Sequence, residues 1–340
     1  MRQASFMLMI LLSLTARPLC AEIYELPPDG FDVIGAVSTI TARHEDTLVD
    51  IARRHGLGYE DIVRANPDVN IWLPGEGTEV VLPTRYVLPP GPRTGVVLNL
   101  AEYRLYYFPK VQDGEPAYVM TYPISIGRMD WETPLGLTEV IAKVRNPSWY
   151  PPQSVRDEHA ADGKHLPRIV PPGPDNPLGE YAMRLGLPGY LIHSTNRPAG
   201  VGMRVTHGCI RMFPEDIEYL FGNLDISTRV RIINAPVKIG WNGEELVLES
   251  HPVLETPAPV ANDAASEPGA EELAQPEPAE VLAAGKDPLT FVTEQFITAT
   301  GERAGQLDWY LAETIVDRSD GIPTPVGRSI KNAAASAASE

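Results

Sequence analysis

Two histidines and a cysteine are gathered in one short stretch, LIHSTNRPAGVGMRVTHGCIRM, residues 191–212. His193 and His207 flank a glycine-rich segment that leads into Cys209. A thiol beside a histidine can act as a nucleophile, because imidazole exchanges protons near neutral pH and an imidazolium lowers a thiol pKa from about 8.5. The same side chains could instead hold zinc, or Cys209 could be a small buried hydrophobe. The residues next to Cys209 favour the nucleophile.

The turn before Cys209 has the composition that a nucleophile needs. Gly208 allows unusual backbone dihedrals and close approach to a ligand, and the amides near Gly208, Cys209 and Ile210 are candidates to face a developing oxyanion. We expect a helix just beyond the turn, with a dipole that favours a thiolate. His207 and His193 both qualify as the base, since either can face the thiol depending on the fold. The residues alone do not choose between them.

The first 21 residues predict export from the cytoplasm. A basic Arg2, an apolar run over residues 6–14 and a small Ala21 form the pattern of a secretory signal peptide. The run is about half the roughly 20 residues of a membrane-spanning helix, so we expect a periplasmic protein without a membrane span.

Cysteine usage excludes a disulfide framework. The chain has two cysteines, Cys20 and Cys209, and cleavage after Ala21 would remove the first. Lipidation of Cys20 is the competing interpretation, although the preceding Arg17-Pro18-Leu19 is a poor match to a lipoprotein signal. A single remaining thiol in an oxidising compartment again favours catalysis.

Composition narrows the class of partner. The net charge is −17, with 45 acidic and 28 basic residues among 340. Nucleic acid is therefore not an expected partner, since phosphate binding needs concentrated positive charge.

The length of the chain allows two or three domains. We expect neither a cofactor nor a metal ion.

Residues 36–86 predict a small βααβ domain. Leu48, Ile51 and Ala52 are at helical spacing after a candidate N-cap, Asp46 or Thr47, and a second helix is expected to end at Asn66. The segment resembles a LysM module. The residues that carry this resemblance are Asp46-Thr47-Leu48, Ile51-Ala52, Ile62, Asn66-Pro67, Leu73, Gly77 and 81–83. The resemblance implies binding to the glycan strands of peptidoglycan, and the alternative is a spacer without a ligand.

Residues 94–235 predict a mainly β domain that contains the cysteine. β-rich runs alternate with turns from Val96 onwards, and a short helix is expected to start at Pro214. Residues 146–180 are expected to be irregular because of their prolines, with Trp149 and Tyr150 as a lid or substrate wall. The remaining histidines of this loop, His159 and His165, are expected to be solvated.

Residues 236–326 predict a small α+β C-terminal domain with two amphipathic helices near its end. An acidic, Pro/Ala-rich insertion, 254–286, has too little apolar surface to offset the entropy of ordering and is expected to be disordered. Residues 327–340 are expected to form a disordered tail.

The stretch around Cys209 is similar to the signature of the L,D-transpeptidase catalytic domain, the YkuD domain: a histidine, a spacer of about a dozen residues, then Ser/Thr-His-Gly-Cys-apolar-Arg/Asn. Here the spacer from Ser194 to Val205 has 12 residues. Further stretches resemble the periplasmic ErfK/YbiS/YcfS/YnhG group; they are NLAEYRLYYFP, PISIGR, IVPPGPDNPLGEYAMRL and DWYLAETIVDRSDGIP. The resemblance implies a β-sandwich with short helices.

The resemblance also implies a role for each residue of the motif. Cys209 would be the nucleophile, His193 the general base and the Ser194 carbonyl the group that orients it. His207, with Gly208, would shape the site, and Arg211 would hold a polar or carboxylate group of the stem peptide. Ser194 stands where enterobacterial relatives commonly carry Gly, which a carbonyl role tolerates.

The implied reaction is acyl transfer on peptidoglycan. Cys209 would attack the bond between diaminopimelate and the terminal D-alanine of a tetrapeptide stem, release D-alanine and pass the stem to an amine. The acceptor is either diaminopimelate of another stem or the C-terminal lysine of the major outer-membrane lipoprotein, and carbapenems would acylate the thiol. A peptidoglycan-binding wall protein without activity is the alternative function.

Overall fold

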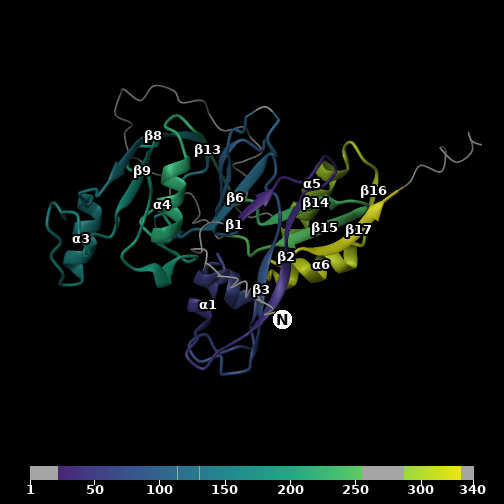
Figure 1. The fold of residues 1–340 in the computed structure, drawn as a ribbon, viewed down its shortest axis with the longest axis horizontal. Helices are drawn as coiled ribbons and strands as arrows, with labels where there is room; N and C mark the ends of the chain where they lie inside the picture. Colours follow the sequence, from purple (N-terminus) through teal and green to yellow (C-terminus); the bar gives the residue numbers. More distant parts are fainter. Residues whose placement is uncertain (1–21, 113, 130, 255–286, 331–340) are drawn as a thin grey trace, which may run out of the picture.

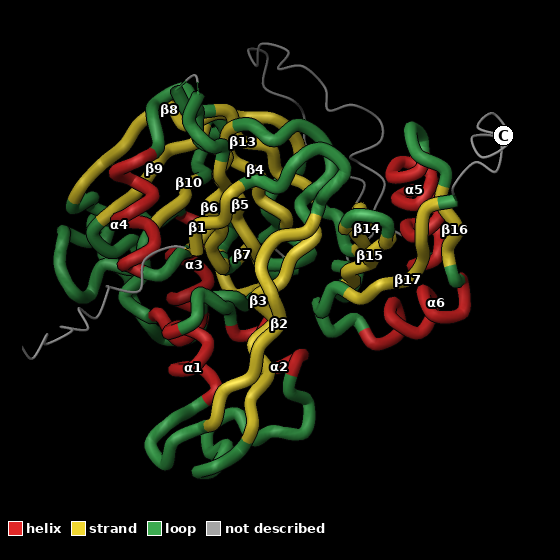
Figure 2. The backbone as a smooth tube through the Cα atoms, turned by 45° about the vertical axis from the view of Figure 1, so that its right-hand side comes forward, coloured by secondary structure: helices red, strands yellow, loops and turns green. Residues whose placement is uncertain are grey.

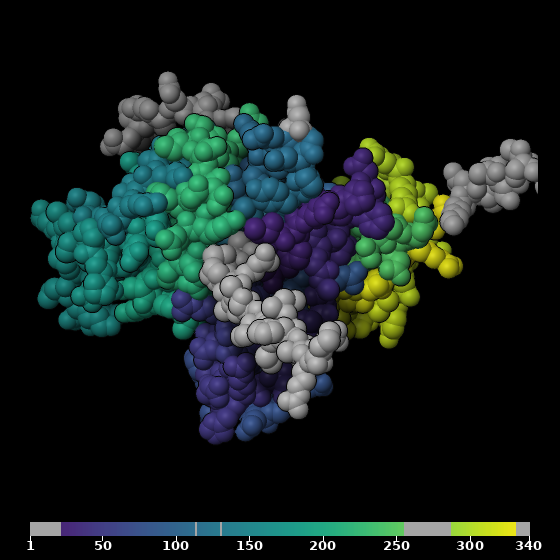
Figure 3. Space-filling view, viewed as in Figure 1, coloured from purple at the N-terminus to yellow at the C-terminus, as the bar shows by residue number. Residues whose placement is uncertain are grey.

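The computed structural model of the protein describes residues 22–112, 114–129, 131–254 and 287–330. The expected signal peptide, with Cys20, and the acidic insertion from residue 255 lie outside these ranges. A central β domain carries an N-terminal unit on one side and a C-terminal domain on another (Figures 1 and 3). Within the described ranges, no helix has the length and apolarity to cross a membrane.

The N-terminal unit has the expected βααβ order. It consists of β2 (Val33–Thr41), α1 (Leu48–Arg54), α2 (Tyr59–Ala65) and β3 (Glu79–Val87). The two strands pair antiparallel along nine residues and extend away from the central domain (Figure 2). Thr47 caps α1, because its side chain accepts a hydrogen bond from Asp50 N at 3.0 Å. The small core contains Leu48, Ile51, Leu57, Ile62 and Val80, all fully buried.

The central domain is built on one nine-stranded sheet, in the order β1-β6-β5-β4-β13-β8-β9-β10-β12. The strands are β1 (Glu22–Glu25), β4 (Gly95–Asn99), β5 (Arg104–Phe108), β6 (Tyr118–Pro123), β8 (Gly136–Arg145), β9 (Tyr181–Leu185), β10 (Leu191–His193), β12 (Ile210–Arg211) and β13 (Arg229–Ile233). Strands β7 (Ile126–Gly127) and β11 (Arg204–Thr206) form a separate parallel pair. A 3₁₀ turn (Pro198–Gly200) lies between β10 and β11.

The expected two-sheet sandwich is therefore not what forms. Strand β13 joins the two halves of the sheet, since it pairs parallel with β4 and antiparallel with β8. The continuous sheet encloses an apolar core that includes Leu98, Leu105, Met183, Ile192 and Ile232. Helix α4 (Pro214–Asn223) begins at the predicted proline and buries Ile217 and Leu220 against this core.

Residues 146–180, called the strap from here on, were expected to be irregular. This prediction is wrong for the middle of the segment, which forms a helix. Helix α3 (Gln153–Ala161) forms there, with Pro152 as its N-cap and Val155 buried. The sequence has no proline between Pro152 and Pro167. The good helix formers after Pro152 can therefore form two and a half turns of helix, which begin directly after this proline.

The C-terminal domain is a four-stranded sheet with two helices on it. The strands are β14 (Val237–Asn242), β15 (Glu245–Ser250), β16 (Gly305–Leu307) and β17 (Thr324–Ser329), and the helices are α5 (Pro288–Thr300) and α6 (Trp309–Arg318). The expected tail from residue 327 starts too early. Gly327 pairs with both Leu246 and Leu307, so the strand continues to Ser329.

A buried ionic cluster fastens the three parts together. Lys238, 1% exposed, lies 2.8 Å from Glu102 Oε1 and 2.9 Å from Glu249 Oε1, and its Nζ donates to Val87 O at 2.7 Å. His251 contacts the same Glu249 at 2.7 Å. The attraction of Lys238 and the hydrogen bond from His251 help keep the pKa of Glu249 below its ordinary value although the carboxylate is buried.

Candidate functional site

The parallel pair of β10 and β12 brings the two ends of the motif together. His193 lies opposite Arg211 in this pair, and Ile192 lies opposite Ile210. Residues two apart on a strand point to the same face. If the alternation of side chains along β12 is extended back by one residue, Cys209 points to the same face of the sheet as Arg211 and His193. Ile192 and Ile210 point to the other face, toward the core.

The imidazole of His193 is buried and fixed at one nitrogen. It is 4% exposed, and its Nδ1 lies 2.6 Å from the carbonyl oxygen of Ser194. Because a carbonyl can only accept, Nδ1 carries the proton and Nε2 keeps its lone pair. Burial, with the nearby charge of Arg211, lowers the pKa of His193 to about 3. The ring is neutral at physiological pH, which suits a general base.

The position of Ser194 is fixed by its neighbours. Its N–H donates to Tyr181 O at 2.9 Å, and the Met212 N–H donates to His193 O at 3.0 Å. Gly179 approaches Ser194 so closely that an added Cβ would lie 2.6 Å from the serine Cβ. The expected orienting carbonyl is thus held between two neighbouring segments.

The thiol of Cys209 is half-buried, and it is the free thiol of the described chain. Its Sγ lies 3.6 Å from Gly189 O. Burial raises its pKa above the ordinary value, and a backbone hydrogen bond from Leu191 and the charge of Arg211 oppose that rise. The expected helix dipole is absent here, because β12 intervenes and α4 begins five residues later, at Pro214. The resting thiol is therefore protonated.

The turn before Cys209 requires glycine at position 208. Gly208 has φ +94°, and an added Cβ would lie 2.8 Å from the ring of Tyr190. The Gly208 carbonyl accepts from Thr133 Oγ1 at 2.8 Å, and the Cys209 carbonyl accepts from Thr206 Oγ1 at 2.6 Å. Because N–H and C=O point in opposite directions across a trans peptide, the first of these bonds aims the Cys209 amide the other way. The Ile210 amide is used within the β10–β12 pair instead.

His207 contacts the strap rather than the thiol. Its Nε2 lies 2.7 Å from Glu158 Oε2 on α3, and Glu158 Oε1 accepts from Arg128 at 2.8 Å. Trp131 packs edge-on against the His207 ring, with centroids 5.1 Å apart. His207 and Arg128 together hold the pKa of Glu158 below its ordinary value. Helix α3 is in this way tied to the nucleophile turn.

Arg211 provides a positive charge within reach of the thiol. The guanidinium is half-buried, and its Nε is buried without a hydrogen-bond partner among the described residues. Burial, together with the charge of Arg197, lowers its pKa. A guanidinium in this condition is suited to bind a carboxylate.

Trp149 and Tyr150, the two candidate wall residues, lie on the strap just before α3. Trp149 exchanges backbone hydrogen bonds with Val170, both 2.9 Å long, and the Tyr150 side chain is 66% exposed. His165 is exposed as expected, whereas His159 is half-buried on α3.

The zinc alternative receives no support from the geometry. Among the described residues, the ligand-type side chains close enough to share one ion are Glu102, Glu249 and His251, and Lys238 already neutralises that group. His193 and His207 instead use ring nitrogens for other contacts.

Three residues that contact the site were missed in the sequence. Glu158, Thr133 and Ser125 come from three different segments, and each fixes a part of the motif. The sequence could have indicated that Glu158 lies on a helix, because the strap contains a proline-free run around this residue. Thr133 and Ser125 had none, because their partners lie 75 residues away in each case.

Comparison with known proteins gives a consistent result. The family model described as the L,D-transpeptidase catalytic domain, YkuD, matches residues 93–232. A probable L,D-transpeptidase ErfK/SrfK of Escherichia coli is 39% identical over 241 residues, which cover 70% of this chain and 76% of that protein. The probable L,D-transpeptidase YcfS of the same species is 39% identical over 247 residues, 71% and 76% of the two chains.

Similarity to solved structures is weaker. An L,D-transpeptidase from Mycobacterium tuberculosis aligns at 22% identity with a TM-score of 0.29, over 46% of this chain and 63% of that one. Membership of a family therefore rests on the sequence relatives and the family model.

Proposed function

The chain belongs to the L,D-transpeptidase family, and we propose that it acts on the tetrapeptide stems of peptidoglycan through a thioester on Cys209. The observation that supports this most directly is the arrangement of His193. Its Nδ1 is bonded to the Ser194 carbonyl, and the β10–β12 register places it on the face of Cys209. The membership makes the enzyme the better hypothesis than a wall protein without activity.

In the first step, Nε2 of His193 takes the thiol proton as Sγ attacks the carbonyl carbon of the L,D peptide bond. The low pKa of His193 keeps the ring unprotonated before attack, so that Nε2 has a free lone pair for this proton. The imidazolium then gives the proton to the amine of the departing D-alanine, and the C–N bond breaks to leave a thioester. An acceptor amine attacks the thioester and loses a proton to the imidazole. The C–S bond then breaks, and the imidazolium returns that proton to the departing sulfur, which restores the thiol.

The amide of Cys209 is our candidate for stabilising the oxyanion. Thr133 fixes the preceding carbonyl, that of Gly208, and so orients this N–H group before substrate arrives. A preorganised donor of this kind contributes about 3–4 kcal/mol to other acyl-transfer reactions. Gly208 is needed for the turn that presents it.

We assign substrate binding to Arg211, with Trp149 and Tyr150 as walls on the strap. The unpartnered Nε of Arg211 is directed to a carboxylate of the stem peptide. His207 holds the turn against α3 through Glu158. The N-terminal unit is proposed to contact glycan strands, in line with its resemblance to LysM modules.

Two acceptors follow from the resemblance: the side-chain amine of diaminopimelate on a second stem, and the terminal lysine of an outer-membrane lipoprotein. Both are primary amines that attack the same thioester. Both place the reaction in the periplasm, where the expected signal peptide would send the chain.

The test is incubation with disaccharide-tetrapeptides, with and without a lysine-terminated lipoprotein peptide, followed by mass analysis. We expect released D-alanine, a protein adduct with the mass of the stem minus D-alanine, and a product that identifies the acceptor. Cys209→Ala should abolish all three, whereas the control His165→Ala, at an exposed loop position, should abolish none. D-alanine release by Cys209→Ala would rule out the mechanism.

A further inference from the structure

We propose that the N-terminal unit is a positioning element of the active site, because it holds the segment that connects His193 with Cys209. This segment, residues 194–208, extends the 12-residue spacer of the motif as far as Gly208 and is called the spacer from here on. The proposal rests on the function proposed above. It assigns to the unit a role in catalysis that is separate from any binding of glycan. Two hydrogen bonds, a backbone contact between glycines and two ion pairs carry it.

The spacer caps helix α2. The Tyr59 N–H donates to Val201 O at 2.9 Å, and the Glu60 N–H lies 3.3 Å from Gly202 O. These are the first two residues of α2. The first four N–H groups of a helix have no acceptor within it, so two carbonyls of the spacer satisfy donors that the N-terminal unit cannot satisfy itself. Separating the two parts would leave both sets of groups unpaired.

The same contact needs glycine on both sides. An added Cβ at Gly58 would lie 2.7 Å from Gly202 Cα, and one at Gly202 would lie 2.3 Å from Tyr59 N. Gly202 also has φ +86°, which L side chains rarely adopt. The two backbones therefore touch directly, and a single methyl group is too large for the space.

The other side of the spacer is fixed to the central domain. Ser125 Oγ donates to Gly200 O at 2.8 Å, and the Ile126 N–H donates to Met203 O at 3.2 Å. Ser125 also exchanges two backbone hydrogen bonds with Arg211, of 2.8 and 3.0 Å. The spacer is thus clamped between the N-terminal unit and the segment that holds β12 in register.

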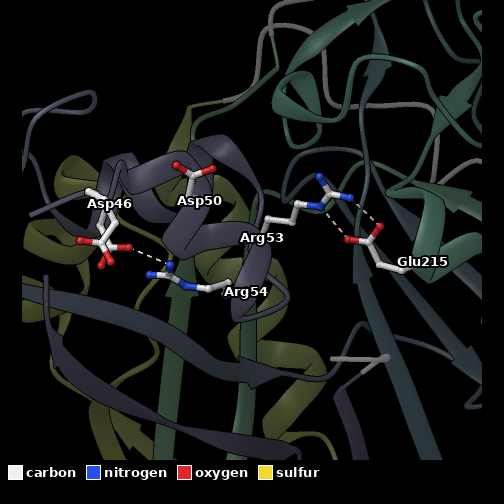
Figure 4. Close-up of a pocket in the computed structure, with 6 residues that line it drawn as sticks. Asp46, Asp50, Arg53, Arg54 and Glu215 are labelled. Carbon is white, nitrogen blue, oxygen red and sulfur yellow. Dashed lines mark hydrogen bonds and ion pairs between the residues drawn. The ribbon is translucent and has the colours of Figure 1, made fainter. Parts of the chain in front are cut away.

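Two ion pairs keep the unit in place. Arg104 of β5, 1% exposed, lies 2.7 Å from Asp61 of α2. Arg53 of α1 makes two hydrogen bonds with Glu215 of α4, of 2.7 and 2.8 Å (Figure 4). The exposed Arg53 pair contributes little by itself, whereas breaking the Arg104 pair would leave a buried charge without its partner.

The contacts on the two sides of the spacer together determine the relative positions of His193 and Cys209. The spacer begins one residue after His193 and ends one residue before Cys209, so a shift at Val201 or Gly202 is transmitted to both. A displacement of about 1 Å of a reacting group costs on the order of 100-fold in rate. A unit that merely tethered the enzyme to its polymer would not be packed against this segment.

The experiment measures acylation of Cys209 by a carbapenem, which is small and carries no glycan, using intact mass over time. The deciding comparison is between two substitutions of Tyr59, by proline and by alanine. Tyr59→Pro replaces the N–H that donates to Val201 with the proline Cδ, which cannot lie against that carbonyl. Position 59 is a helix position that favours proline, and Gly58 already has the extended ψ of 172° that precedes proline well. Tyr59→Ala removes the same ring and keeps the N–H.

Loss of this hydrogen bond should slow acylation at saturating carbapenem by about 3- to 10-fold in Tyr59→Pro relative to Tyr59→Ala. The half-saturating concentration should change by less than about twofold, the limit expected when geometry rather than binding is affected. Gly58→Ala should show the same pattern. Its matched control is Gly222→Ala on α4, where an added Cβ meets nothing within 4 Å.

Hydrogen exchange over residues 196–208 reports whether the spacer has loosened. Faster exchange with slower acylation in Tyr59→Pro supports the proposal. Equal acylation rates in Tyr59→Pro and Tyr59→Ala would overturn it, whatever the exchange shows. A wild-type protein that carbapenem does not acylate would instead count against the proposed function, so the two failures are distinguishable.

Discussion

The ionisation state of the resting site can be tested by thiol alkylation. Burial lowers the pKa of His193 to about 3, so at pH 7 the neutral ring outnumbers the imidazolium by about ten-thousandfold. Burial also raises the pKa of the Cys209 thiol above its ordinary value, so the thiol is protonated at pH 7. The free enzyme therefore contains a neutral pair and not a thiolate–imidazolium ion pair, and proton transfer accompanies attack on the substrate.

The assay is the rate of reaction with iodoacetamide between pH 5 and 10, followed by intact mass. We expect the rate to rise about tenfold per pH unit through pH 8, as the thiolate fraction does. His193→Gln should leave this profile nearly unchanged, because the imidazole is not stabilising a thiolate. The same variant should lose acylation by carbapenem or tetrapeptide by on the order of 100-fold or more, since a general base contributes that much.

A plateau of alkylation between pH 5 and 7 that disappears in His193→Gln would refute this reasoning. Such a plateau is the signature of a preformed ion pair. His165→Gln, on an exposed part of the strap, controls for general effects of replacing histidine.

Three further predictions concern charged residues outside the pair of His193 and Cys209. Asp216 is buried and its pKa is raised to about 8, so the folded state keeps a proton that the unfolded state loses near pH 3.8, and stability falls as pH rises from 4 to 8. His193 affects stability in the opposite direction between pH 3 and 6.5, because folding lowers its pKa. Asp216→Asn should therefore raise the melting temperature most clearly between pH 6.5 and 8. A melting temperature with the same dependence on pH as in the wild type would contradict this. Lys238→Met should destabilise the protein by about 3–5 kcal/mol in urea unfolding, because it leaves two buried carboxylates without their partner; a loss below 1 kcal/mol would speak against the cluster. Glu158→Gln should lower the acylation rate less than about fivefold, as expected for a partly exposed pair, with Glu180→Gln at another strap position as control; equal rates in the two variants would remove Glu158 from the site.

Much of the local structure followed from the sequence. The start of α4 at Pro214 and the βααβ order of the N-terminal unit were predicted from residue type and spacing, as was a cap at Asp46 or Thr47, of which the structure uses Thr47. These features depend on contacts within a few residues, which periodicity and capping rules describe. The same rules failed in the strap, where a high overall proline content hid a proline-free run long enough for α3, and at the C-terminus, where β17 continues past residue 326 because of its partners.

The sequence by itself indicated which residues would carry the proposed chemistry: Cys209, two histidines and a glycine turn at the spacing of one family. Tertiary structure alone decided how they are used. The register of β10 against β12 puts His193 on the face of Cys209, while α3 draws His207 away to Glu158. Burial makes the pair neutral, where sequence reasoning had favoured a thiolate. Strand register, burial and the docking of the N-terminal unit onto the spacer depend on partners far away along the chain, and no local pattern encodes them.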